Sequence, residues 1–321
     1  RCVNCNTDNR NSKRRCTNCS YDFSRPVRSN NRLFLQEIRR AGAMGPVSDT
    51  LRLSIQNGAD INTLSAMVTP QTGLMLAATV GNRQIVQFLI GLTGLDINYQ
   101  TTFGNTALSI AASEGHHACV VILLTGLDIN VNMQNLVGGT ALIGAVSSGR
   151  YLSVKCLLQH EGIDANIQDE HGQTALFIAA GLHRPQTIAT MVERHLRHPC
   201  LDVNIQSDDG STALMRAVTY NRPRNVRVLL RVPDLNIVCM NNMGNTALTI
   251  PLLQRGAQNI LRSWHGHMTN RVRQWRYIAR RKRRRREKGL SKYISRKKNT
   301  PHGPERHIGD FLQHSFIKLR F

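Results

Sequence analysis

Four cysteines near the beginning of the chain have the type and spacing that hold a metal ion. Cys2 and Cys5 form one C-x-x-C pair, ten residues follow, and Cys16 and Cys19 form a second pair. Four thiolates on two such turns match the tetrahedral coordination of a structural Zn²⁺ and leave no open position for catalysis. Because so short a segment has almost no core, the metal would supply its folding energy. We therefore predict one structural zinc ion at these four residues, with free or disulfide-bonded cysteines as the alternative.

Histidines at five other positions invite a metal or acid–base interpretation: His116, His117, His183, His195 and His198. No carboxylate or cysteine stands beside them at a recurring spacing, and no phosphate loop or nucleophile motif is present. We expect His116 and His117 to be structural and His195 and His198 to be solvated. Cys119 and Cys156 occupy apolar helix positions and are expected in the core. The sequence predicts no enzyme.

The positive charge of the chain is concentrated at its two ends. The net charge is +22, of which residues 1–32 carry +6 and residues 262–321 carry +16. Residues 33–261 contain fifteen basic and fifteen acidic residues. The middle of the chain is therefore neutral and needs a separate explanation. Apolar runs such as residues 119–124 are far too short to span a bilayer, so no transmembrane segment is expected.

The middle of the chain repeats a Thr-Ala-Leu triplet. The triplet stands at 106–108, 140–142, 174–176, 212–214 and 246–248, and Thr-Gly-Leu at 72–74 is a weaker copy. The threonines are 34, 34, 34, 38 and 34 residues apart. Self-similarity at this period indicates a solenoid whose units stack on one another.

Each copy predicts two short helices. In residues 104–112 a glycine suited to a turn precedes Thr106, a candidate helix N-cap, and an alanine-rich helix follows. Gly115 ends this helix, and residues 118–124 form a second, more apolar one. Equivalent second helices are expected at 85–90, 154–158, 188–192 and 226–230.

An Asp or Asn marks the loop that projects toward the next copy. Asp96, Asp164 and Asp202 lie ten residues before the next threonine of the series. In the other two copies Asn130 and Asn236 keep this spacing, whereas the aspartates two residues earlier do not. The register is therefore constant, and the one four-residue insertion falls within 193–201.

These features resemble the ankyrin repeat family, whose pattern G-x-T-P-L-H-x-A-A-x-x-G, then I-V-x-x-L-L and G-A-D-V-N, is matched over residues 72–262. The resemblance implies an all-α solenoid of helix-turn-helix-loop units. Ala replaces the Pro in five copies, and the His is absent from all six, at Met75, Ser109, Ile143, Phe177, Met215 and Thr249. Because that His bridges neighbouring loops in the family, we expect weaker hydrogen bonding between repeats.

The array is expected to cover residues 33–265 and to end in caps. Apolar residues within 33–55, followed by Asn-Gly-Ala-Asp-Ile-Asn at 57–62, form a degenerate N-terminal repeat. The sixth copy is also degenerate, because Pro251 interrupts its first helix and Arg262 and Ser263 stand where its second helix should be apolar. Solenoids need such polar terminal units. The remaining segments are predicted to be a zinc ribbon at 1–24, a linker at 25–32 and a disordered basic tail at 266–321.

The N-terminal segment resembles short zinc ribbons of the form C-P-x-C-G-x9-C-x-x-C-G, with Asn6 and Ser20 in the two Gly positions. A ribbon followed by ankyrin repeats resembles the double zinc ribbon and ankyrin repeat proteins. This chain carries one ribbon, and its start at Arg1 is consistent with a second ribbon upstream.

The concave surface of such an array, formed by loop tips and by the exposed ends of the first helices, is the expected partner-binding surface. Here it comprises residues 100–103, 133–137, 168–171, 206–209 and 239–243, with helix positions Ser113, Glu114, Ser147, Ser148, Thr219 and Tyr220. The predicted partner-binding residues are Gln100, Thr101, Thr102, Asn135, Asp169, Glu170, His171, Asp208, Asp209, Asn241 and Asn242. The set is polar and mildly acidic in the fourth and fifth copies, which favours a protein partner.

The tail contains seven consecutive cations: Arg280, Arg281, Lys282, Arg283, Arg284, Arg285 and Arg286. An apolar stripe within 260–278 predicts an amphipathic helix before them. Three interpretations stay open for the cluster: a nuclear import signal for an importin, phosphate contacts with nucleic acid, or a target for calmodulin or an anionic membrane. A merely solubilising tail is the remaining alternative.

The sequence as a whole predicts a monomeric adaptor or scaffold for protein partners. Cys119, Cys156, Cys200 and Cys239 are scattered without pairing logic, which suits a reducing compartment. We expect the cytoplasm, with the nucleus as a second location. The alternative function is that of a nucleic-acid-associated protein whose ribbon and tail contact phosphates.

Overall fold

The computed structural model describes residues 24–66, 69–197, 201–250 and 256–266. In chain order its helices are α1 (Ser24–Ala41), α2 (Asp49–Gln56), α3 (Gly73–Val80), α4 (Arg83–Ile90), α5 (Ala107–Glu114), α6 (His117–Leu123), α7 (Ala141–Ser147), α8 (Tyr151–Gln159), α9 (Ala175–Gly181), α10 (Pro185–Arg197), α11 (Ala213–Thr219) and α12 (Pro223–Leu229). A further helix covers residues 256–266. The predicted helix pairs are all present between residues 73 and 229.

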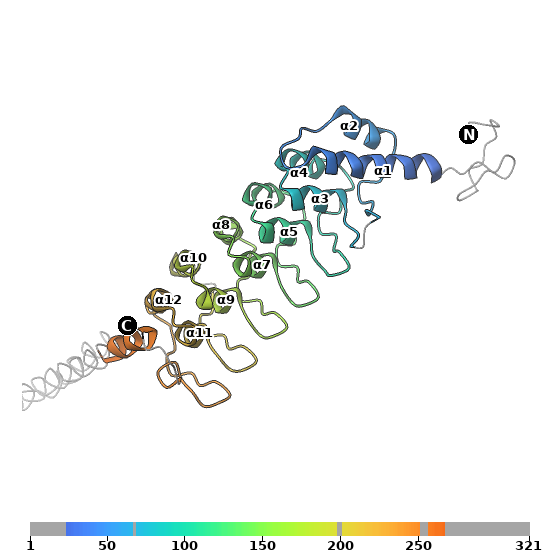
Figure 1. Cartoon of the computed structure of the whole chain (residues 1–321). Helices are drawn as coiled ribbons and strands as arrows, with labels where there is room; N and C mark the ends of the chain where they lie inside the picture. The colour runs from blue at the N-terminus through green and yellow to red at the C-terminus, as the bar shows by residue number, and fades with distance from the viewer. Residues whose placement is uncertain (1–23, 67–68, 198–200, 251–255, 267–321) are drawn as a thin grey trace, which may run out of the picture. The chain divides into compact units, whose positions relative to one another are not determined.

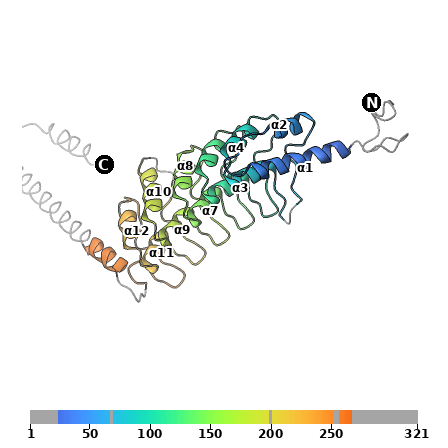
Figure 2. The same cartoon turned by 45° about the horizontal axis from the view of Figure 1, so that its top comes forward.

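The helices alternate between two rows (Figure 1). In the first row α1, α3, α5, α7, α9 and α11 pack side by side, and in the second row α4, α6, α8, α10 and α12 do the same. The long connections between pairs project as hairpin loops to one side, next to the first row (Figure 2). This arrangement leaves a groove between the loops and the first-row helices.

A threonine begins each first-row helix from α3 to α11. The side-chain oxygens of Thr72, Thr106, Thr140, Thr174 and Thr212 accept a hydrogen bond from the backbone N–H three residues later, at 3.1–3.4 Å. Each bond satisfies an N–H that has no partner within the helix, which explains why the triplet starts with Thr. The predicted N-caps are therefore confirmed.

Small side chains allow the helices to approach closely. Ala77, Ala111, Ala145, Ala179 and Ala217 take the same place in successive first-row helices, and each is fully buried. Cys119 is fully buried in α6, and burial raises the pKa of its thiol to about 11. Cys156 in α8 is half-buried and packs against the same core. Both cysteines are thus core residues, as predicted.

The N-terminal cap consists of α1 and α2, and Phe34, Ile38 and Leu51 form its buried face. The degenerate first repeat is therefore present. The predicted linker is wrong, because residues 25–32 belong to α1, which begins at Ser24. The sequence lacks a glycine or an internal proline that would stop a helix between 28 and 41, and its apolar positions 34, 35 and 38 follow helical spacing.

The insertion and the C-terminal copy depart from the regular unit. The second helix of the fourth full copy, α10, has thirteen residues, and the other second-row helices from α4 to α12 have seven to nine. In the sixth copy, Thr246 precedes a turn over 247–249 and not a helix. Ala257 and Leu261 are fully buried in the helix over 256–266. The compact unit that contains the array ends at Leu261, and a second unit comprises Arg262–Phe321.

Candidate partner-binding groove

The hairpin loops owe their shape to one polar side chain and one glycine in each copy. In the loop before α9, the Asp169 carboxylate accepts from the N–H groups of His171 and Gln173 at 3.0 and 2.8 Å. Gly172 follows with φ of +68°, a conformation that favours glycine. Asn135 and Gly138 have the same roles one repeat earlier. These contacts fix each loop as a closed turn.

Glutamines at the start of the loops connect each loop to the next. The Gln100 amide donates to Gly104 O within its own loop at 2.8 Å and to Gln134 O of the next loop at 2.9 Å. Gln134, Gln168 and Gln206 repeat both bonds. Backbone bonds run alongside, for example from Glu170 N–H to Val137 O at 3.0 Å. The loops therefore form a continuous sheet-like wall.

Asparagines form a second series of bonds at the other end of the loops. Asn98 donates to Asp128 O at 2.7 Å and accepts from Asn130 N–H at 2.8 Å. Asn62, Asn132 and Asn204 make the same pair of bonds with the repeat that follows each of them. The N–H groups of Asp96, Asn130, Asp164 and Asn236 are equivalent acceptor-bound groups in this series, so the predicted register is confirmed at Asn130 and Asn236.

A third series crosses from each repeat to the helix end of the previous one. The His116 Nε2 atom lies 3.0 Å from Thr79 O, and Arg150 Nε donates to Ser113 O at 3.0 Å. Arg184 and Arg222 take the same place and donate to Gly149 O and Gly181 O. His116 is therefore structural, as predicted. Weaker hydrogen bonding between repeats, expected from the missing family His, is not observed, because these three series join the repeats.

A hollow of about 290 Å³ lies in the groove where three repeats meet. Its walls come from the loops before α7 and α9 and from the exposed sides of α5, α7 and α9. The lining residues outside the caps include Ser113, Ser147, Val137, Glu170, His171 and Ile178. The hollow is small, open to both polar and apolar groups, and built on a fixed loop wall.

The groove surface is acidic in its C-terminal half. Glu170 and His171 pair with each other at 3.8 Å, and both side chains are more than half exposed. Asp208 and Asp209 are exposed at the next loop tip. Slight desolvation opposes ionisation of Asp209, but hydrogen bonds from Ser207 and Ser211 prevail and lower the pKa of this carboxyl. This end of the groove is thus negatively charged at neutral pH.

The predicted partner-binding residues separate into two groups. The side chains of Gln100, Thr101, Asn135, Asp169, Asp209 and Asn241 take part in hydrogen bonds that hold the loops. They are scaffold residues, and the polar pattern alone did not separate them from the rest. Thr102, Glu170, His171, Asp208 and Asn242 are exposed at the loop tips. Asn135, Asp169, Glu170 and His171 lie together at the hollow.

Apolar residues at the loop tips were missed as individual candidates, although they lie in the predicted loop ranges. The exposed fractions of Phe103, Leu136, Val137 and Met243 are 57, 72, 49 and 84%. Tyr220, predicted on the helix side, is 49% exposed and lies against the guanidinium groups of Arg216 and Arg222. Their signal was available in the sequence, because these positions differ from copy to copy whereas the glutamine positions do not.

No group of three or more His, Cys, Asp or Glu residues that could hold a metal ion occurs in the described part of the chain. The predicted zinc ligands Cys2, Cys5, Cys16 and Cys19 lie outside the described residues, as do His198 and the cations at 280–286. Within the described residues, no helix is long and apolar enough to cross a membrane.

Comparison with known proteins agrees with this geometry. The family described as "Ankyrin repeats (3 copies)" matches residues 41–135 and 129–198. No curated protein matches the chain. Among solved structures, the ankyrin repeat domain of Bcl-3, described as a unique member of the IkappaB protein family, is similar with a TM-score of 0.61. The two chains are 22% identical, over 72% of this chain and 97% of that one, so this likeness concerns the fold alone. The chain therefore contains ankyrin repeats, and its helical array is an ankyrin-repeat solenoid.

Proposed function

We propose that this chain is an adaptor that binds protein partners in the groove between its loop wall and its first-row helices. Ankyrin repeats are interaction modules, and extended concave surfaces are the binding faces of solenoids. The observation that carries the proposal is the hollow formed by three repeats, beside exposed tip residues that do not hold the scaffold. Because the loop wall is fixed by hydrogen bonds, binding requires little ordering of the loops.

The mixture of side chains at the tips also supports a protein partner. Leu136 and Val137 offer exposed apolar surface, and Glu170 next to them offers a carboxylate. Partner surfaces typically combine apolar anchors with a polar rim. The proposal assigns no reaction to the chain.

The test is capture of proteins from a cell lysate by the full chain and by two charge-matched triple variants. In the groove variant, Leu136→Asp, Val137→Asp and Glu170→Lys change three exposed tip residues. In the control, Val121→Asp, Leu152→Asp and Glu161→Lys change exposed residues on or next to α6 and α8 in the second row. Proteins captured by the wild type and by the control should be lost from the groove variant, because buried anchors dominate binding energy.

Equal capture by the groove variant and the wild type would contradict the proposal. The nucleic-acid alternative has a specific basis in the net charge of +16 in residues 262–321. It would replace the adaptor function if deletion of residues 271–298 abolished retention of RNA or DNA at physiological salt while no protein depended on the groove.

The two ends of the chain complete the proposal. The cysteine spacing supports one structural zinc ion at Cys2, Cys5, Cys16 and Cys19. The cations at 280–286 would direct the protein within the cytoplasm or to the nucleus. Metal analysis of the purified full chain should find one zinc ion per chain, and Cys2→Ser with Cys5→Ser should remove it. A ratio well below one in the wild type would overturn the ribbon assignment.

A further inference from the structure

One face of α1 carries three arginines around a leucine. Helical geometry places Arg28, Arg32, Leu35 and Arg39 within about 60° of one another around the helix axis. The three arginines are exposed, and Leu35 is 7% exposed. The apolar face of α1 that packs into the cap is formed instead by Phe34 and Ile38. The arginine face is therefore not needed for folding of the cap.

These three cations have no anionic partner in the described part of the chain. The ion pairs found there join Arg40 to Glu37 and His171 to Glu170, and none involves Arg28, Arg32 or Arg39. Three like charges on one helix face repel one another slightly, because residues at such spacings are neighbours on the helix surface. An anion bound among them would relieve this repulsion.

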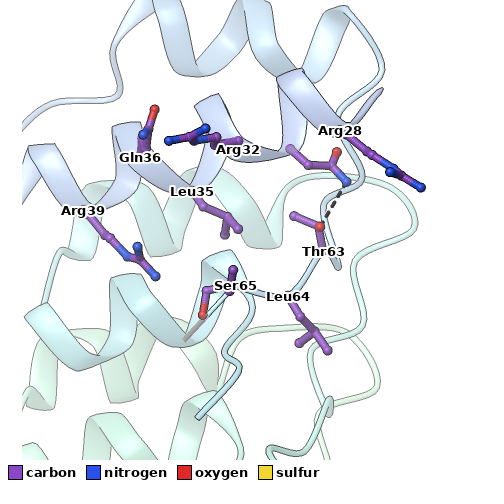
Figure 3. Close-up of a pocket in the computed structure, with 10 residues that line it drawn as sticks. Arg28, Arg32, Leu35, Gln36, Arg39, Thr63, Leu64 and Ser65 are labelled. Atoms are coloured by element: carbon purple, nitrogen blue, oxygen red, sulfur yellow. Dashed lines mark hydrogen bonds between the residues drawn. The ribbon is translucent and has the colours of Figure 1, made fainter. Parts of the chain in front are cut away.

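The arginine face borders a groove, which we call the α1 groove (Figure 3). It lies between α1 and residues 63–66, and its volume is about 550 Å³. Leu35 and Arg39 extend from α1 toward the segment with Leu64 and Ser65 (Figure 3). Leu64, on the opposite wall, is 42% exposed. The groove thus offers cations on one wall and apolar surface on both.

The walls of the α1 groove are fixed relative to each other. The Asn31 amide donates to the Thr63 hydroxyl at 3.0 Å, and its oxygen accepts from Asp60 N–H at 2.8 Å (Figure 3). Ser65 N–H donates to Gln71 O at 2.9 Å, and Gln71 N–H donates to the Ser65 hydroxyl at 3.0 Å. These bonds hold the loop at the distance at which the groove stays open.

We infer that the α1 groove binds an extended acidic peptide of a partner protein, with its carboxylates on the arginines and apolar side chains on Leu64. This inference rests on the proposed function, because it gives the groove of the array a second, charged subsite. Arg binds carboxylates in a fixed fork geometry, and the apolar wall adds contact area that a free anion would not use.

Charge argues against the other occupants. The cationic segment at 280–286 has the same sign as the arginine face and would be repelled. A long polyanion such as RNA would extend from this subsite toward Glu170, Asp208 and Asp209 at the other end of the array, where the loop tips are acidic. A peptide of a few residues meets only the basic end.

The geometry also predicts the sequence pattern of the peptide. The rise of an α-helix places Arg28 and Arg39 about 16 Å apart along α1. An extended peptide rises about 3.3 Å per residue and turns successive side chains to opposite sides. Five residues with carboxylates at the first, third and fifth positions would face the arginines, and apolar residues between them would face Leu64. The expected pattern is Glu-Leu-Glu-Leu-Glu.

The test measures fluorescence anisotropy of a labelled peptide, Gly-Ser-Glu-Leu-Glu-Leu-Glu-Ser-Gly, with the full chain at physiological salt. Binding should be weakened roughly tenfold or more by the triple variant R28E/R32E/R39E, because three favourable charge contacts become repulsive. The matched control R83E/R224E/R227E changes net charge equally at exposed arginines of α4 and α12, and its affinity should stay within about twofold of wild type. The neutral variant R28Q/R32Q/R39Q should show an intermediate loss.

Two further measurements keep the basic tail from imitating the result. A peptide with the same composition in the order Glu-Glu-Glu-Leu-Leu should bind several-fold more weakly, whereas a cation cluster without a fixed apolar wall would bind both alike. A photoreactive leucine analogue in the peptide should cross-link to residues 28–39 or 63–66. Cross-links confined to 271–298, or equal affinity of R28E/R32E/R39E and the wild type, would overturn the inference.

The remaining outcomes separate this inference from the proposed function. If R28E/R32E/R39E weakens binding of an RNA oligonucleotide and leaves peptide binding unchanged, the α1 groove is a nucleic-acid site. If the peptide binds as expected but the tip variant at 136, 137 and 170 captures every protein that the wild type captures, the adaptor proposal fails and the α1 groove stands. If capture depends on the tips but the peptide does not bind, only the inference about α1 fails.

Discussion

Single residues in the loops have two distinct tasks, and recurrence along the chain distinguishes them. Glutamine recurs at 100, 134, 168 and 206, where its amide joins neighbouring loops. Four residues before the capping threonine the series is Thr102, Leu136, Glu170, Asp208 and Asn242, with no residue type repeated. A position that keeps its residue in every copy serves the scaffold, whereas a position that varies is available for binding.

The glycine two residues before each capping threonine is a scaffold residue with a measurable role. A Cβ atom at Gly138 would lie 2.8 Å from Glu170 N of the next loop, whereas a Cβ at Gly244 would meet nothing within 4 Å. Both residues have a positive φ, +73° and +72°. Gly244→Ala should therefore cost about 1–2 kcal/mol in unfolding free energy from backbone strain. Gly138→Ala should cost about 2–4 kcal/mol, because overpacking adds to the strain.

Urea unfolding of the two variants followed by circular dichroism would measure this difference. Gly244→Ala is the matched control, since the substitution and the backbone conformation are the same at both sites. Equal destabilisation of the two variants would mean that stacking of one loop on the next contributes nothing at Gly138.

Helices and loops were predicted to different extents from the sequence. The Thr caps, the alanine-rich first helices and the register at Asn130 and Asn236 follow from local spacing, so the sequence contains them directly. Bonds such as Asn132 to Gly162 join residues 30 positions apart, and only the stacking of units brings them together. The start of α1 at Ser24 was missed, because the arginines and asparagines of 25–32 have no apolar periodicity.

The asparagine series should stabilise the interface between neighbouring repeats. Asn132 donates to Gly162 O at 2.8 Å and accepts from Asp164 N–H at 2.9 Å. Asn132→Ala removes both bonds, and we expect a loss of about 1–2 kcal/mol in unfolding free energy. Gln159→Ala, at an exposed position of α8, is the control and should change stability by no more than about 0.5 kcal/mol.

Hydrogen exchange locates the effect of Asn132→Ala. In a solenoid each unit contacts only its neighbours, so the loss should be local to one interface. The Asp164 amide should exchange faster in the variant than in the wild type, and amides of α11 should be unaffected. Faster exchange spread evenly over the array, with no change specific to Asp164, would show that the bond is not a local connection.

At the scale of the whole molecule, charge is distributed by segment. Residues 33–261 are neutral, whereas the segments 1–32 and 262–321 are basic, so nucleic-acid affinity and protein binding would reside in different parts. Within the array the arginine face of α1 and the acidic tips at 170, 208 and 209 give the two ends opposite charge. Composition alone could not predict this polarity, because it depends on which side chains the loop wall leaves exposed.

The central claim is that partners bind at the loop tips and first-row helices. Its most direct test is the dissociation constant of a protein captured by the wild type, measured with the wild type, the tip variant at 136, 137 and 170, and the second-row control at 121, 152 and 161. We predict a loss of about thirtyfold or more in the tip variant, which corresponds to about 2 kcal/mol, and a control within about twofold of wild type. Equal affinity for all three proteins would contradict the account.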